Sequence, residues 1–340
     1  MCADDAGLEE YIEPTSGKTI QFQRDIKGAV APANNLYTTV VQYDSKSPSI
    51  GCPDSNPHRR CPIDMPRVSK AKNGAPKLPN APLTEVVFEL RWKLSAEEDG
   101  STTLPADPGY RACLDSFVGA AERLGFAVAR RVSQGPFEMG YSVDFRFFKG
   151  PDSRFPILQL GPGIFAANES TDYSWTDYKI HCVNGIHALL ASYPKMKRFD
   201  FQPTQIQLKY IDAFKPKDGK SIDYLAFLRE STHIDVAFPD FLQDRRFGTP
   251  DSGRVSLAFP VSKMNDTNFA FAFANGLVSQ VPCVVLETSV TTKLPEPRKT
   301  RFGPEFVSSW LEQAHDLTSP FFKSIVKQPL MKQFLGNSGE

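Results

Sequence analysis

The sequence predicts an α+β fold in which a mainly antiparallel sheet carries helices on one face. Every second residue from Val86 to Trp92 is apolar, which is the pattern of a strand with one buried side. Most later strand-like runs follow one another through short turns, which favours antiparallel pairing. The element order β-α-β-β-β-α occurs in residues 81–198 and again in 199–336. We therefore expect two pseudo-repeated halves that form one compact core.

The bulk composition excludes several classes of protein. The chain has 340 residues, of which 39 are basic and 39 acidic, so no overall charge draws it to nucleic acid or to a membrane. No apolar run reaches the ~20 residues of a membrane span. The first residues, Met1–Asp5, are acidic and resemble no secretory signal. Six irregularly spaced cysteines predict reduced thiols. We expect a cytoplasmic protein that needs no cofactor.

Residues 1–80 form an N-terminal extension with a different composition. Residues 18–23 and 37–43 have the β-propensity of two short strands, which predicts a small hairpin. Residues 44–80 are rich in Pro, Ser, Gly and Asn and contain few large apolar side chains. Such a segment buries too little surface to offset its ordering entropy, so we expect a linker or a loosely docked arm.

A metal site in this extension is considered and set aside. Cys52, His58 and Cys61 are ligand types that zinc uses. Their spacing is not that of a zinc knuckle, and the only further cysteine before them is the distant Cys2. We favour loop thiols over a metal site.

The same extension carries a basic run that gives an alternative function. Its side chains are the ones that contact phosphates in nucleic-acid-binding arms. A solubilising linker is the favoured interpretation. The residues that would bind nucleic acid under the alternative are Arg59, Arg60, Arg67, Lys70 and Lys72.

The elements of the first half follow the strand at 81–92. Asp107-Pro108 indicates a helix start, with Asp at the cap, and Gly125 indicates its end. Gly161-Pro162-Gly163 interrupts an extended run as a bulge or tight turn, so one strand or two are expected there. The other expected elements are strands at 126–132, 141–147 and 157–165 and a helix at 172–193.

The second half begins again with a strand. Phe269, Phe271 and Phe273 alternate with alanines, and we favour a core role over base stacking for these rings. Ser319-Pro320 predicts the start of a separate helix after the one that begins at Pro304. The remaining expected elements are strands at 205–214, 254–261, 268–274 and 283–291 and helices at 222–230 and 304–317.

Several stretches together resemble a sporadically distributed bacterial protein family that has no established activity. The resemblance covers about residues 78–336. It implies a bacterial cytosolic protein and an association with mobile loci such as defence or toxin–antitoxin systems. The element order also resembles the β-α-β4-α unit of TATA-binding-protein-like folds, which is an analogy of fold alone. The stretches that carry the family resemblance are 78–83 with 86–92, 158–165, 173–175 and 310–317.

No motif in the chain names a reaction. The sequence has no phosphate-binding loop, no dinucleotide fingerprint after a strand and no nucleophile elbow. His181 and His187 are six residues apart on one expected helix, a poor spacing for shared ligation, and His315 is expected to be structural. Glu287 is a weak acid–base candidate in mid-strand. We assign no catalytic residue.

Three functional hypotheses remain. The first, which we adopt, is a non-enzymatic protein-interaction or regulatory module whose partner is another protein, with a homo-oligomer as a further option. The second is a nucleic-acid-binding protein that uses an open sheet and the basic arm. The third is an enzyme or small-ligand binder with a cleft between the two halves.

Overall fold

The chain divides into two compact units, Met1–Val68 and Ser69–Glu340. In the first unit, β1 (Leu8–Ile12) pairs antiparallel with β2 (Thr19–Gln23). The expected strand at 18–23 is therefore confirmed, but its partner precedes it in the chain. The expected strand at 37–43 lies outside the residues that the structure describes. This computed structural model describes residues 8–12, 19–23, 78, 80–96, 105–132, 140–170, 173–195, 201–216, 222–243, 253–278, 280–294 and 302–336.

The second unit is built on one nine-stranded sheet in which every pairing is antiparallel. The α+β prediction with a large antiparallel sheet is thus confirmed. Across the sheet the order is β11-β12-β13-β10-β3-β9-β8-β7-β6. The strands are β3 (Leu83–Trp92), β6 (Val128–Arg131), β7 (Phe145–Phe148), β8 (Ile157–Gly161), β9 (Ile164–Glu169), β10 (Pro203–Phe214), β11 (Arg254–Pro260), β12 (Thr267–Val278) and β13 (Val281–Lys293). A separate two-residue pair joins β4 (Ser95–Ala96) to β5 (Pro105–Ala106).

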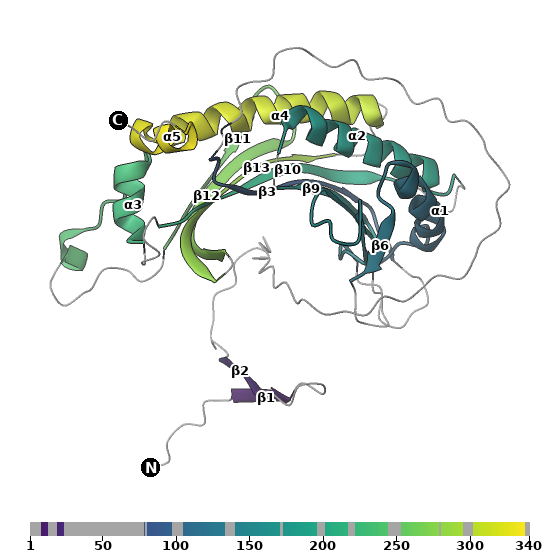
Figure 1. Ribbon diagram of the computed structural model, residues 1–340, viewed down its shortest axis with the longest axis horizontal. Helices are drawn as coiled ribbons and strands as arrows, with labels where there is room; N and C mark the ends of the chain where they lie inside the picture. Colours follow the sequence, from purple (N-terminus) through teal and green to yellow (C-terminus); the bar gives the residue numbers. More distant parts are fainter. Residues whose placement is uncertain are drawn as a thin grey trace. The chain divides into compact units, whose positions relative to one another are not determined.

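The long helices cover one face of this sheet (Figure 1). Helices α1 and α2 contact each other, and α2 contacts α4. None of the described helices combines the length with the apolar character that a membrane crossing needs. The helices are α1 (Tyr110–Arg123), α2 (Trp175–Ser192), α3 (Tyr224–Ser231), α4 (Pro304–Ile325) and α5 (Gln328–Phe334), with a 3-10 turn at Asp240–Gln243.

Strand β3 shows which face of the sheet the helices cover. Its alternate residues from Val86 to Trp92 are fully buried beneath the helices, as the sequence predicts. The intervening side chains lie on the helix-free face, where Glu85 begins a polar ladder across four strands. In that ladder Arg146 donates to Gln159, Gln159 donates to Asn168 at 2.7 Å, and Asn168 donates to Glu85 at 2.6 Å.

The strand period then places the residue after Asn168 on the opposite face. Successive side chains of a strand point to opposite sides. Glu169 therefore turns towards α2, in line with Phe165, whose ring packs beneath the helices against Phe88. Glu169, at the end of β9, is the residue of this strand that lines the site described below.

Two helix boundaries differ from those predicted. Helix α1 begins at Tyr110 rather than directly after Asp107. The Asp107 carboxylate accepts a hydrogen bond from the main-chain nitrogen of Gly109 in the turn before the helix, and its other bonds are tertiary. It accepts hydrogen bonds from the Trp92 indole and the Tyr193 hydroxyl, both at 2.7 Å.

The second difference concerns Pro320, where the sequence predicts a new helix. Helix α4 instead runs continuously through Pro320. A proline in a helix removes one main-chain donor. The buried stripe of α4 continues on both sides of it, from Val307 to Ile325, so packing against the sheet outweighs that loss.

Candidate functional site

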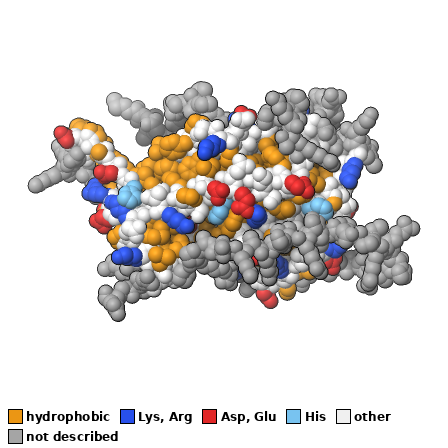
Figure 2. Space-filling model, turned by 90° about the horizontal axis from the view of Figure 1, so that it is seen from above, with side chains coloured by type: hydrophobic (Ala, Val, Ile, Leu, Met, Phe, Trp, Pro, Cys, Tyr) orange, Lys and Arg blue, Asp and Glu red, His pale blue; other side chains and the backbone are white. Residues whose placement is uncertain are grey.

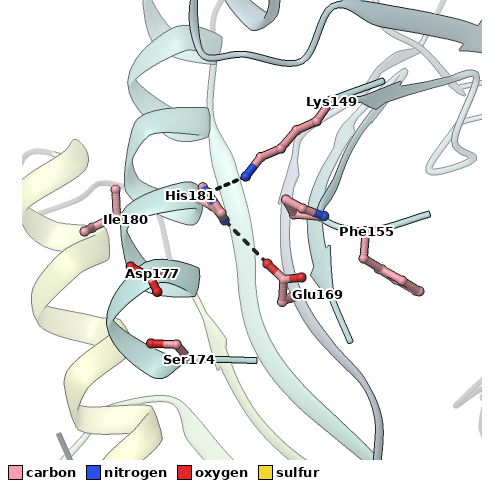
Figure 3. Close-up of a pocket in the computed structure, with 8 residues that line it drawn as sticks. Lys149, Phe155, Glu169, Ser174, Asp177, Ile180 and His181 are labelled. Carbon is pink, nitrogen blue, oxygen red and sulfur yellow. Dashed lines mark hydrogen bonds and ion pairs between the residues drawn. The ribbon is translucent and has the colours of Figure 1, made fainter. Parts of the chain in front are cut away.

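An open pocket of about 520 Å³ lies beside the N-terminal half of α2 (Figure 3). It is formed where the segment after β7, the end of β9 and the first two turns of α2 meet. All of its described lining residues lie between positions 149 and 181, so the pocket is not at the junction of 81–198 and 199–336. These residues are Lys149, Phe155, Pro156, Glu169, Ser174, Asp177, Ile180 and His181.

The imidazole of His181 lies between a cation and an anion in this pocket (Figure 3). Its Nε2 atom is 3.5 Å from the ammonium nitrogen of Lys149. Its Nδ1 atom is 3.6 Å from a carboxylate oxygen of Glu169. An ammonium group can only donate hydrogen bonds, so Nε2 is the accepting nitrogen and Nδ1 carries the proton of the neutral ring.

The carboxylate of Glu169 accepts fewer hydrogen bonds than a carboxylate with so little exposure normally does. The residue is 8% exposed, and a buried carboxylate normally accepts several hydrogen bonds. Within the described part of the chain its only polar partner is His181, at a distance too long for a good hydrogen bond. The Nδ1 atom of His181 is itself buried without a hydrogen-bond partner. Among the described residues, the pocket therefore contains an under-used acceptor, the carboxylate of Glu169, beside an unpaired donor, the Nδ1–H group of His181.

A second polar cluster lies at the start of α2 and joins it to α4. The hydroxyl groups of Tyr173 and Tyr210 are 2.9 Å apart, and the Tyr210 hydroxyl is 2.9 Å from His315 Nδ1. Burial raises the pKa of both tyrosines well above the ordinary value. Burial lowers the pKa of His315 despite the opposing carboxylate of Glu312. These groups are therefore neutral and act as hydrogen-bonding partners between the two helices.

The edge strand β11 presents a different kind of surface. It pairs with β12 and is an outer strand of the sheet. Leu257 and Phe259 are 49% and 48% exposed, and their side chains lie on the helix-bearing side, where Phe259 stacks on Phe271. Hydrophobic side chains gather in a broad area on this side of the molecule (Figure 2). We call the exposed strand β11 with Leu257 and Phe259 the β11 edge.

The opposite edge of the same sheet is protected by charge. Strand β6 is four residues long and ends in two arginines. The Arg130 guanidinium lies over the Phe148 ring at 5.0 Å and also donates to the carbonyl of Pro151. Charged residues and short length are the usual protection of an edge strand. Strand β11 has seven residues, and Arg254 and Pro260 stand at its two ends. Its central residues, Val255 to Phe259, are uncharged.

The structure places the residues singled out from the sequence in different environments, and some of them lie outside the described residues. Phe273 is fully buried and Phe271 is 5% exposed beneath the helices, so the core interpretation is confirmed for these two rings. Phe269 is partly buried and packs against Phe321. Glu287 lies on the helix-free face opposite Ile211. The basic residues Arg59, Arg60, Arg67, Lys70 and Lys72 and the set Cys52, His58 and Cys61 lie outside the described residues.

Sequence reasoning missed the pocket because its polar groups come from three separate segments. His181 is considered there only as a possible partner of His187. The signal that was present is the parity of Glu169, which shares its strand face with Phe165 and Ala167. A carboxylate on the buried face of a strand needs a partner or a polar cavity, so its position indicates a candidate functional site.

Comparison with known proteins adds no family to this description. No family model matches the chain, and no curated protein matches it either. The fold is that of an α+β protein with one large antiparallel sheet. It carries two candidate sites, the pocket and the β11 edge.

Proposed function

We propose that this protein is an interaction module that receives an extended segment of a partner protein along the β11 edge. The observation that carries this proposal is the contrast between the two edges of one sheet. The β6 edge is short and arginine-protected, whereas the β11 edge is longer, uncharged in its centre and half-exposed at Leu257 and Phe259. An unprotected edge strand is a template for another strand.

The physics of strand addition fits this edge. Main-chain hydrogen bonds to an edge give affinity, and contacts to alternate side chains give specificity. Leu257 and Phe259 are two residues apart and therefore lie on the same side, where Phe259 packs against Phe271 and Phe271 packs against Phe321. A partner strand with apolar residues at alternate positions would cover both. Covering these half-exposed side chains contributes about 1 kcal/mol each.

The experiment compares three forms of the protein purified gently from the organism that makes it. These are the wild type, the double variant Leu257→Lys with Phe259→Lys, and the control Val118→Lys. Val118 is also exposed, at 39%, but lies on α1. We expect native mass spectrometry to show a partner on the wild type and the control and its loss from the double variant. Hydrogen exchange of the wild-type complex should show slowed exchange in residues 254–260.

Two results would overturn the proposal. One is a partner retained in full by a folded double variant. The other is a wild-type protein that stays a bare monomer through gentle purification. A homodimer that the double variant disrupts would identify the partner as a second copy of this chain.

We infer further that residues 81–198 and 199–336 are related halves. Strands β3 and β10 begin the two halves and pair with each other in the centre of the sheet. Outward from β3 the neighbours are β9, β8, β7 and β6, and outward from β10 they are β13, β12 and β11. In both halves the strand next to the centre is therefore the last strand of that half, and earlier strands follow outward. Under this inference β9, β8 and β7 correspond to β13, β12 and β11, and β6 is an additional strand that only the first half has.

A circular permutant tests whether the halves are units. The start of the core lies beside its end, because Asn80 donates from its main chain and its side chain to the carbonyls of Phe334 and Gln333. A short linker from 336 to 78, with new ends opened between 195 and 201, keeps each half continuous. We expect this permutant to unfold cooperatively. A permutant opened between 216 and 222 should be less stable, and the reverse ranking would contradict the inference.

We place this interaction in the bacterial cytoplasm, in a defence or toxin–antitoxin system. The support is the family resemblance together with the free thiols of Cys113, Cys182 and Cys283, which fit a reducing compartment. A tagged copy expressed at its native level should fractionate with cytoplasmic markers, and recovery with the cell envelope or the medium would contradict this placement.

A further inference from the structure

The pocket beside α2 has one place for a cationic group. Glu169 is nearly buried, opens to the pocket, and has only the distant Nδ1 atom of His181 as a polar partner among the described residues. A second carboxylate, that of Asp177, lines the same pocket from an exposed position on α2. A group that brings several N–H donors and a positive charge would satisfy this acceptor capacity.

A metal ion is not the group that fits. Within the described ranges, no three His, Cys, Asp or Glu side chains are close enough together to hold one. The Lys149 ammonium also faces this side, in contact with His181, and would repel a bare divalent cation. An organic ammonium with directional N–H bonds is the better match.

The pocket also has one place for an anionic group. The Lys149 ammonium donates to His181 Nε2 at 3.5 Å and lies 6.0 Å from the Phe126 ring. An ammonium has three N–H donors, so donors remain for a ligand. Lys149 is an exposed residue at the rim, and the imidazole of His181 separates it from Glu169 (Figure 3).

The remaining wall of the pocket is apolar. Phe155, Pro156 and Ile180 line it, and all three are only partly buried by the protein itself. A volume of about 520 Å³ falls within the range of small-ligand sites. The site thus combines one anionic place, one cationic place and an apolar wall at the scale of a small molecule.

We propose that this pocket binds a free amino acid with an apolar side chain. The ligand's ammonium group is held by Glu169, with Asp177 at the mouth, and its carboxylate by Lys149. Its side chain packs on Phe155, Pro156 and Ile180. His181 keeps Glu169 and Lys149 apart, so that the two ligand groups are received separately instead of the protein's own charges neutralising each other. This site is separate from the β11 edge.

Isothermal titration with L-phenylalanine, L-leucine and two blocked relatives tests the proposal on the full chain. N-acetyl-L-phenylalanine lacks the ammonium group, and L-phenylalaninamide lacks the carboxylate. We expect the wild type to bind at least one of the free amino acids, and to bind each blocked relative of L-phenylalanine at least about tenfold more weakly than the free form. This preference for the free form supports the assignment of both charged places.

Variants assign each place in turn. Glu169→Gln should weaken binding of L-phenylalanine about tenfold or more while leaving the weak binding of the N-acetyl form unchanged. Lys149→Met should abolish the preference for L-phenylalanine over its amide. Lys195→Met, an exposed lysine outside the pocket, should bind as the wild type does. The double variant at Leu257 and Phe259 should also bind normally, which separates this proposal from the interaction proposal.

Several outcomes would overturn the amino-acid site. These are no heat of binding for either free amino acid at millimolar concentration, equal binding of L-phenylalanine and its N-acetyl form, or unchanged binding by Glu169→Gln. Because Lys149 is exposed, its variant is expected to fold even if Glu169→Gln does not. A retained preference for the free carboxylate in Lys149→Met would then refute the assignment by itself.

Discussion

The indole of Trp175 lies flat on the imidazole of His315, with ring centroids 3.9 Å apart and planes 10° from parallel. This stack joins the first turn of α2 to the middle of α4. The indole nitrogen also donates to Glu312 at 3.1 Å, and Lys179 pairs with the same carboxylate. Burial opposes ionisation of Glu312, but the bonds from Lys179 and Trp175 outweigh it, so the pKa of this carboxyl is lowered. The helix pair is held by one small network.

Removing the indole should loosen this helix pair. We expect Trp175→Ala to lower the free energy of unfolding by about 2–4 kcal/mol, because it deletes a stacked aromatic ring and a hydrogen bond. Trp175→Phe keeps a ring for the stack and loses only the bond to Glu312, so about 1 kcal/mol is expected. Urea unfolding followed by circular dichroism measures both. Equal losses for the two variants would show that the stack itself contributes little.

Asp212 should make the protein less stable at high pH than at low pH. Burial raises the pKa of its carboxyl from 3.8 to about 7, so between these values the folded protein retains a proton that the unfolded chain has lost. The stability contribution therefore falls as pH rises from about 4 to about 7 and stays low above that range. Asp212→Asn cannot ionise and should be more stable than the wild type at pH 8, by a difference on the order of a few kcal/mol.

The comparison of wild type and Asp212→Asn isolates this group from its neighbours. Burial lowers the pKa of His315, so that residue costs stability as pH falls below its unfolded value, which is the opposite trend. Its effect is common to both proteins and cancels in the difference. Unfolding free energies at pH 4, 6 and 8 should diverge towards pH 8. Parallel curves would show that Asp212 is solvated in the folded protein.

Two helix glycines should respond in opposite directions to alanine. A Cβ atom at Gly185 of α2 would lie 2.6 Å from Phe165 Cζ, whereas at Gly119 of α1 the nearest atom is Arg123 Nη1 at 3.6 Å. We expect Gly185→Ala to destabilise the protein by about 1–3 kcal/mol through overpacking. Gly119→Ala should stabilise it by up to about 1 kcal/mol, because alanine is the better helix former. Thermal unfolding of both variants checks the signs, and a stabilising Gly185→Ala would mean that α2 can move away from the sheet.

The Asp107 carboxylate should be costly to replace. Besides Trp92 and Tyr193, it accepts from the main-chain nitrogens of Gly109 and Gly163 at 3.1 and 3.2 Å. Asp107→Asn turns one acceptor into a donor that faces other donors, so a loss of about 3 kcal/mol or more is expected. Tyr193→Phe removes a single bond and should cost about 1 kcal/mol. Denaturant unfolding compares the two, and similar losses would mean that water replaces the missing acceptor.

The strands were predictable from sequence because their signal is local. The alternation from Val86 to Trp92 and the phenylalanine row from Phe269 to Phe273 each identify a strand and its buried face. The interruption by Gly161-Pro162-Gly163 marks a real turn, where two strands meet and Gly163 has a φ of 74°. Local patterns failed where a side chain serves a distant partner. Asp107 lies at the predicted helix start and accepts from Gly109, but its carboxylate also binds the distant Trp92 and Tyr193.

The pocket was not predictable because it depends on sheet register. His181 and Glu169 are twelve positions apart and belong to different elements, so only the packing of α2 on β9 brings them within 3.6 Å. The exposure of the β11 edge likewise depends on strand order, which local periodicity does not contain. The sequence-based hypothesis of a protein partner therefore rested on the absence of catalytic motifs, and the edge now gives that hypothesis a surface.

The three described cysteines can report how often three different elements of the fold open. Cys113, Cys182 and Cys283 lie buried in α1, α2 and β13. Burial raises the pKa of each thiol, that of Cys113 to about 12, so none is reactive while its element stays closed. The rate at which an alkylating reagent modifies each one therefore reports how often that element opens. Mass-resolved labelling would thus measure the opening of α1, α2 and β13 separately in the wild-type protein.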